Sequence, residues 1–178
     1  MRLLAGIAVN GLLTVVQIVG GLISGSLALV ADALHNLNDA AALALALVAR
    51  RIARKPADRR RTFGYRKAEA IGALVNTTAL LLVAAYLVYQ AVMRAISPQV
   101  IDGWIVVGVA ALALVVDLIT ALLTRALARD SINVRAAFVH NLSDALGSLA
   151  VMVTGVLVLV FGWTLADVVA TLLIAGYI

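Results

Sequence analysis

The chain contains no cysteine, only two prolines, and few aromatic or charged residues. Without cysteine it has neither a disulfide framework nor a thiolate metal site, and its three methionines offer few ligands to a soft metal such as Cu(I). Charged residues make up 13% and hydrophobic residues 64% of the 178 residues, whereas soluble domains have roughly 25% and 45–50%. The composition therefore excludes a soluble domain and indicates a protein that crosses a membrane several times.

Long apolar runs fill most of the chain and are separated by short polar breaks. Because about 20 apolar residues cross a bilayer as a helix, we predict an all-α membrane protein, a bundle of six transmembrane helices that forms one transmembrane domain over residues 1–178. The last run is short for a full crossing, so we expect the native protein to continue past residue 178. The predicted spans cover about residues 3–23, 27–49, 68–93, 101–125, 132–160 and 164–178.

Basic residues are concentrated beside the second predicted connection, which holds nine of the 14. Others precede the first span or flank the fourth connection, and Arg94 alone lies on the opposite side. Because cytoplasmic loops carry an excess of Lys and Arg, we predict cytoplasmic N- and C-termini in a bacterial inner (plasma) membrane. Contact with anionic lipid also suits these residues, so the pI near 10.2 does not indicate a nucleic-acid partner. The nine are Arg50, Arg51, Arg54, Lys55, Arg59, Arg60, Arg61, Arg66 and Lys67, and Arg125, Arg129 and Arg135 flank the fourth connection.

One short pattern occurs twice, about a hundred residues apart. His35 and Asp39, and again His140 and Asp144, lie four positions apart within apolar runs. Residues at this spacing share a helix face, so each copy presents an imidazole beside a carboxylate. Two such faces would supply two nitrogens and two oxygens, a ligand set that tetrahedral Zn²⁺ takes. We predict that these four residues bind a metal ion.

Both copies are predicted to lie at the same membrane depth. At 1.5 Å per residue, positions 35 and 39 lie roughly 12 and 18 Å from the outer start of the second span. Positions 140 and 144 lie equally far from the inner start of the fifth span, which runs in the opposite direction. In a core of about 30 Å both pairs straddle the midplane, where substrate sites of alternating-access transporters lie. Four matched ligands at one depth argue against the simpler explanation that each histidine only hydrogen-bonds to a neighbouring helix.

Four further polar residues in the predicted spans are candidates for supporting the ligands or lining an ion pathway. One precedes the first histidine by three positions, one follows each histidine directly, and one lies alone in the fourth span. Polar residues close to metal ligands often orient them, although packing and hydrogen bonding between helices are the alternative for each. The four are Asp32, Asn36, Asn141 and Asp117.

With these motifs the chain resembles the transmembrane part of the cation diffusion facilitators, a family that exports zinc and other divalent metals in exchange for protons. The resemblance lies in residues 26–39, 61–70 and 140–144 and in Asp167 of the last span. It implies a six-helix bundle, a homodimer, and a transport site with two histidines and two aspartates between the second and fifth spans. It also implies a cytoplasmic metal-sensing domain after the sixth span, which this chain lacks.

We therefore expect a secondary transporter that exports a divalent cation from the cytoplasm in exchange for protons. Two nitrogens with two oxygens favour Zn²⁺, with Cd²⁺ and Co²⁺ as competitors, and the ion is a substrate, so no cofactor is expected. No Walker A phosphate loop occurs, so an ion gradient must supply the energy. Two other classes fit less well. An intramembrane zinc enzyme would need a HExxH-type helix, and a helical structural or assembly subunit does not predict two equal motifs at equal depth.

Overall fold

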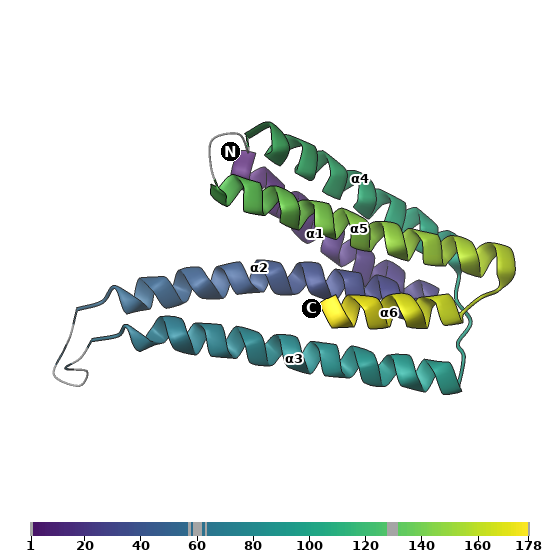
Figure 1. Cartoon of the computed structure of the whole chain (residues 1–178), viewed down its shortest axis with the longest axis horizontal. Coiled ribbons are helices and arrows are strands. Elements are labelled where there is room, and N and C mark those ends of the chain that lie inside the picture. The colour runs from purple at the N-terminus through teal and green to yellow at the C-terminus, as the bar shows by residue number, and fades with distance from the viewer. Residues whose placement is uncertain (1, 57, 59–61, 63, 128–131, 178) are drawn as a thin grey trace.

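The computed structural model consists of six helices over the residues that it describes, which are 2–56, 58, 62, 64–127 and 132–177 (Figure 1). The predicted all-α class is confirmed. The predicted break at 129–131 and the basic residues Arg59, Arg60, Arg61 and Arg129 lie wholly or partly outside the described residues. In chain order the helices are α1 (Arg2–Ser24), α2 (Leu27–Ala53), α3 (Lys67–Ile96), α4 (Gly103–Leu127), α5 (Ile132–Phe161) and α6 (Leu165–Tyr177).

The helix ends differ from the predicted spans by a few residues, for identifiable reasons. Helix α2 continues past residue 49 to Ala53, because Arg50 and Arg51 in its last turn are favourable at the negative end of the helix dipole. Helix α4 begins at residue 103 instead of 101, because Asp102 caps it. The Asp102 Oδ1 atom accepts a hydrogen bond from the Trp104 backbone N at 3.0 Å, as helix-capping side chains do.

Asp167 of α6 fixes the start of α2. Gly25, with φ of +73°, makes the tight turn that leads out of α1, a conformation that glycine adopts without strain. The Asp167 carboxylate then accepts hydrogen bonds from Ser26 Oγ at 2.5 Å, Leu27 N at 2.8 Å and Ala28 N at 3.3 Å. Because the Asp167 side chain is only 1% exposed, these bonds tie the first turns of α2 and α6 together inside the protein.

Arg94 near the end of α3 joins the same cluster. Its guanidinium donates a hydrogen bond to the Gly25 carbonyl and lies 3.9 Å from the Asp167 carboxylate. We call Gly25, Ser26, Arg94 and Asp167 the Asp167 clamp. The clamp joins α2, α3 and α6 at one end of the bundle, and it gives a role to the one basic residue that the sequence places away from the others.

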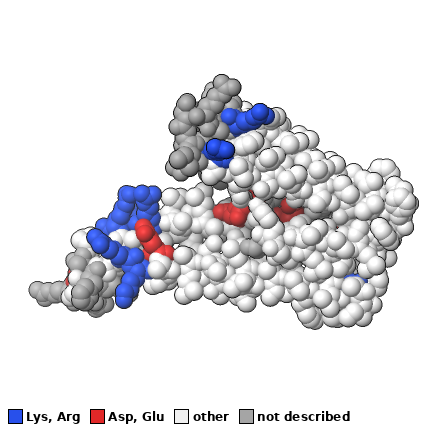
Figure 2. All heavy atoms as spheres, viewed as in Figure 1, with Lys and Arg blue, Asp and Glu red and all other residues white. Residues whose placement is uncertain are grey.

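The helices form two groups, one with α4 and α5 and the other with α2, α3 and α6, and the separation between the groups varies along the bundle. Helices α4 and α5 pack closely along their length, and α1 packs against α2 and α4. Gly155 permits this close approach, because a Cβ there would lie 2.8 Å from Val107 Cγ2. Figure 1 shows that α5 and α2 diverge toward one end of the bundle. Helices α2 and α4 finish at that end, and α3 and α5 begin there. Lys and Arg side chains gather at that end, which we call the basic end (Figure 2).

Three helical segments of the described chain are long and apolar enough to cross a membrane, namely Lys67–Ile96, Gly103–Arg125 and Arg135–Phe161. The segments Asn10–Ser24 and Leu165–Tyr177 are shorter apolar helices. Helix α2 is long but less apolar, because it carries the polar residues of the repeated motif in its middle. The protein is thus a helical membrane protein, while six crossings with cytoplasmic termini stay a prediction.

Replacing Asp167 by alanine should destabilise the fold, because three donors at the start of α2 lose their acceptor and Arg94 loses its counter-charge. We expect a loss of about 2–3 kcal/mol, measured as a lower midpoint of thermal unfolding of the purified protein in detergent. As a control, Asp102→Ala removes an exposed cap and should cost about 1 kcal/mol. Equal midpoints for Asp167→Ala and the unsubstituted protein would show that the clamp does not stabilise the fold.

Candidate metal site

The structure brings the two copies of the motif together. His35 and Asp39 lie on α2 and His140 and Asp144 lie on α5, and the four side chains meet where these helices approach each other. Each pair shares one helix face because its members are four positions apart. Since α2 and α5 run in opposite directions (Figure 1), the two pairs face each other in opposite order.

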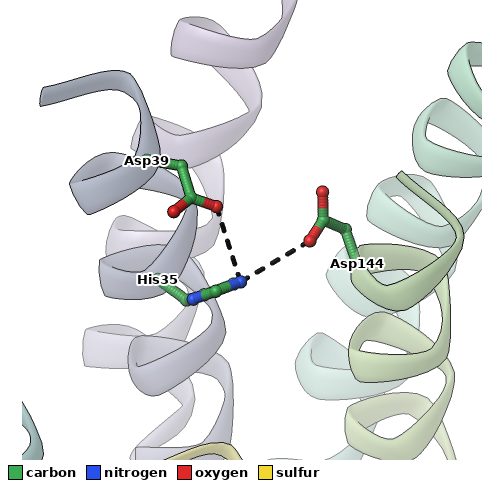
Figure 3. Close-up of side chains that lie close together, drawn as sticks. All are labelled: His35, Asp39 and Asp144. Carbon is green, nitrogen blue, oxygen red and sulfur yellow. Dashed lines mark ion pairs between the residues drawn. The ribbon is translucent and has the colours of Figure 1, made fainter. Parts of the chain in front are cut away.

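Each histidine lies close to both carboxylates. His35 Nε2 is 3.5 Å from Asp39 Oδ2 and 3.5 Å from Asp144 Oδ1 (Figure 3). His140 Nε2 is 3.2 Å from Asp39 Oδ2 and 3.6 Å from Asp144 Oδ2. Zinc–ligand bonds of about 2.0–2.2 Å at tetrahedral angles would place the ligand atoms about 3.3–3.6 Å apart. The four nitrogen–oxygen distances lie close to this range, and the two distances to Asp144 involve different oxygens of its carboxylate.

Three of the four residues form a tighter group. His35, Asp39 and Asp144 offer ligand atoms that all lie within 4.8 Å of one another, and Figure 3 shows them directed at a common point between α2 and α5. The ring centroid of His140 is 6.5 Å from that of His35. With a side chain that is 46% exposed, His140 has the most freedom of the four to adjust to a bound ion.

Several side-chain atoms of the predicted ligands lack hydrogen-bond partners among the described residues. Among the described residues, the buried side-chain atoms without a partner are Nδ1 and Nε2 of His35, Oδ2 of Asp39 and Oδ1 of Asp144. An unsatisfied buried polar atom costs about 1–3 kcal/mol and is rare in native proteins. Three of these atoms face one another at the point where the two helices meet. A divalent cation there would satisfy all three, and the two carboxylates would neutralise its charge.

The site is more exposed toward the basic end of the bundle. Asp39 and His140, the members nearer that end, have side chains that are 33% and 46% exposed, whereas His35 and Asp144 are each 11% exposed. Figure 2 shows acidic atoms at the surface between the two diverging groups of helices. Of the four predicted ligands, the two nearer the basic end are therefore the more accessible.

A buried polar network closes the opposite side of the site. Asp32 of α2 accepts a hydrogen bond from Gln17 Nε2 of α1 at 2.6 Å, and its Oδ2 lies 3.3 Å from Ser148 Oγ of α5. Ser148 Oγ also donates to Asp117 Oδ2 of α4 at 2.8 Å, and Asn36 Nδ2 donates to Gln17 Oε1 at 3.2 Å. All five residues are buried. We call them the Asp32 network, and together they join α1, α2, α4 and α5.

The four predicted supporting residues thus have different positions. Asp32, Asn36 and Asp117 belong to the Asp32 network, whereas Asn141 donates a hydrogen bond to Thr124 Oγ1 of α4 at 3.0 Å. These bonds position the helices that carry the ligands. Gln17 and Ser148 are not among the residues predicted from the sequence, although a polar residue within an apolar run is a signal that could have identified both.

The chain is similar to known proteins over nearly its whole length. Residues 3–178 match the family model of the cation efflux transmembrane domain. The chain is 39% identical over 175 residues to the zinc transporter ZitB of Pectobacterium atrosepticum, covering 98% of the chain and 55% of the relative. It is 34% identical over 163 residues to the cadmium, cobalt and zinc/H(+)-K(+) antiporter of Bacillus subtilis, covering 90% and 52%.

A third relative, the metal cation efflux system protein CzcD of Cupriavidus metallidurans, is 37% identical over 172 residues, which cover 97% of the chain and 54% of that protein. The chain therefore spans about half the length of the curated relatives that it matches. The names of all three describe transport or efflux of metal cations.

Replacing Gln17 by leucine should destabilise the protein, because Asp32 loses its 2.6 Å donor and Asn36 loses its acceptor inside the bundle. The expected loss is about 1–3 kcal/mol, again measured as the midpoint of thermal unfolding in detergent. Gln90→Leu is the matched control, since Gln90 bonds to Tyr86 at an exposed position and should change stability by no more than about 0.5 kcal/mol. If both variants unfolded at the same temperature, the Asp32 network would have no special part in stability.

Proposed function

Because the chain belongs to the cation efflux family, we propose that it forms the membrane pathway of a secondary transporter that exports a divalent cation. Zn²⁺ is the favoured substrate and protons are the exchanged ions. One observation carries the proposal, namely that ligand atoms of His35, Asp39 and Asp144 lie within 4.8 Å of one another and that His140 Nε2 lies 3.2 Å from the Asp39 carboxylate. The names of the relatives, a zinc transporter, an antiporter and an efflux protein, support the same function.

The proposed topology has six transmembrane helices and both termini in the cytoplasm of a bacterial cell. The basic end supports this orientation, because Lys and Arg are enriched in cytoplasmic loops and gather at one end of the bundle (Figure 2). Helix α2 can cross the membrane despite its polar residues, because Asp32 and Asn36 are buried against other helices and His35 is largely covered.

In this topology the described state is open toward the cytoplasm. The more exposed ligands, Asp39 and His140, lie on the cytoplasmic side, and the buried Asp32 network lies on the other side. An ion would therefore enter from the cytoplasm and be released only after the opposite side opens. This order of accessibility supports export by alternating access, for which midplane sites are typical.

Proton exchange follows from the chemistry of the ligands. Imidazole in water has a pKa of about 6.5, and only its neutral form binds a metal ion. Binding of Zn²⁺ near neutral pH therefore displaces protons from histidine. On a more acidic outer side, protons would compete with the ion and favour its release. One cycle would then move a metal ion outward and protons inward.

We also propose a homodimer, as the family resemblance implies, with α3 as a candidate contact surface. In the apolar window of Lys67–Ile96 only 6% of the residues are buried, against 28% and 33% in the windows of Gly103–Arg125 and Arg135–Phe161. Most of α3 therefore faces lipid or a second copy. The metal site needs no second copy, because all four ligands belong to one chain.

Transport can be tested with the purified chain in liposomes that contain a zinc-sensitive dye. An imposed pH gradient should drive Zn²⁺ flux, and His140→Ala or Asp144→Ala should reduce both the flux and the zinc bound per chain to near background, because each removes one of four ligands. Asp102→Ala, which changes a carboxylate outside the site, should transport normally. Flux that does not respond to the gradient would refute proton coupling, and full zinc binding by both site variants would refute the site.

Metal selectivity gives a second test. His35→Asp replaces a nitrogen ligand by oxygen, and sites richer in oxygen suit Mn²⁺ and other hard ions better than Zn²⁺. The variant should bind Zn²⁺ more weakly and transport Cd²⁺ or Mn²⁺ better relative to Zn²⁺, measured by competition between metals in the liposome assay. Zinc selectivity equal to that of the unsubstituted protein would contradict a ligand role for His35.

A further inference from the structure

An aromatic ring from α6 contacts the predicted metal site. The ring of Tyr177 meets the ring of His35 edge-on, with centroids 5.3 Å apart and an angle of 64° between the ring planes. Aromatic pairs favour this geometry at separations of about 4.5–7 Å. The contact links the site to a helix that supplies none of the four predicted ligands.

No hydrogen bond from another described residue orients the ring of His35. Its Nδ1 is buried and has no hydrogen-bond partner within the described part of the chain. A histidine that binds a metal ion through one nitrogen usually donates the other ring N–H to a carboxylate, a carbonyl or water, which fixes the ring. Without such a bond, the terminal ring torsion is broad and roughly two-fold. Tyr177 is therefore in a position to restrict rotation of the His35 ring by contact.

The Asp167 clamp sets the position of Tyr177. Helix α6 packs along α2 in the same direction (Figure 1), and Asp167 bonds to the first turn of α2. At 1.5 Å per residue, the rise from Asp167 to Tyr177 is about 15 Å, and that from Leu27 to His35 is about 12 Å. The clamp thus places the ring of Tyr177 at the level of His35.

We propose that Tyr177 is a positioning residue that holds the His35 imidazole with Nε2 directed at the bound metal ion. The proposal rests on the proposed function, since it requires His35 to be a ligand. It also makes the ligand geometry depend on α6, because any shift of α6 along α2 moves the ring that supports His35.

The test uses Co²⁺ as the probe, because its visible absorption distinguishes tetrahedral from octahedral coordination. The full chain is purified in detergent and titrated with Co²⁺, and Zn²⁺ is then added in competition. Tyr177→Leu should weaken Co²⁺ binding about two- to tenfold and reduce the tetrahedral absorption per bound ion. Tyr177→Phe keeps the ring and should behave like the unsubstituted protein. Tyr89→Leu, at an exposed position on α3, is the matched control and should change neither property.

The outcomes separate this inference from the proposed function. If the unsubstituted protein gave no tetrahedral Co²⁺ spectrum, the metal site itself would be refuted. If it gave one and Tyr177→Leu gave the same spectrum and affinity, only the positioning role would be overturned. The role would also be overturned if Tyr177→Leu lost binding only in proportion to a lower thermal stability, or if Tyr177→Phe were as defective as Tyr177→Leu.

Discussion

Burial of carboxylates among apolar helices is the constraint on which the rest of this structure depends. A carboxylate removed from water costs several kcal/mol unless it is paired or hydrogen-bonded. Asp32, Asp117 and Asp167 are all buried, and each accepts hydrogen bonds from a different helix. Their donors therefore determine which helices lie together. Asp39 and Asp144 differ, because each has a buried oxygen that faces the histidines without a hydrogen bond.

The helices and the predicted ligand set follow from local rules, and this part could be predicted from the sequence. The four-residue spacing places His35 beside Asp39 and His140 beside Asp144 on any helix, and the span lengths place both pairs at one depth. Their proximity in the structure agrees with that reasoning. Helix ends were less predictable, because a cap such as Asp102 acts through its own side-chain geometry.

The hydrogen-bond partners within the Asp32 network and the position of Tyr177 could not be predicted, because they depend on how each helix is rotated against its neighbours. Ser148 bonds to carboxylates on two other helices, whereas Thr154, about 1.7 turns further along α5, bonds to the Ala150 carbonyl of its own helix. The neighbouring sequence does not indicate which of the two hydroxyl groups bonds to another helix and which bonds to its own. Likewise, a tyrosine near the end of an apolar run is typical of a membrane-interface anchor, and only the packing of α6 on α2 places Tyr177 beside a histidine.

The Asp32 network also has a mechanical consequence. Ser148 of α5 contacts Asp32 of α2 and Asp117 of α4, and Gln17 of α1 bonds in turn to Asp32. A tilt of α5 relative to α2 would therefore pivot near Ser148. His140 lies about 12 Å from the pivot along the helix, and Ile132 at the start of α5 lies about 24 Å away. A tilt that moved His140 by 1 Å would move the start of the helix by about 2 Å. An ion that draws His140 toward Asp39 would therefore act close to the pivot, and the separation of the helices at the basic end would change about twice as much as the position of His140.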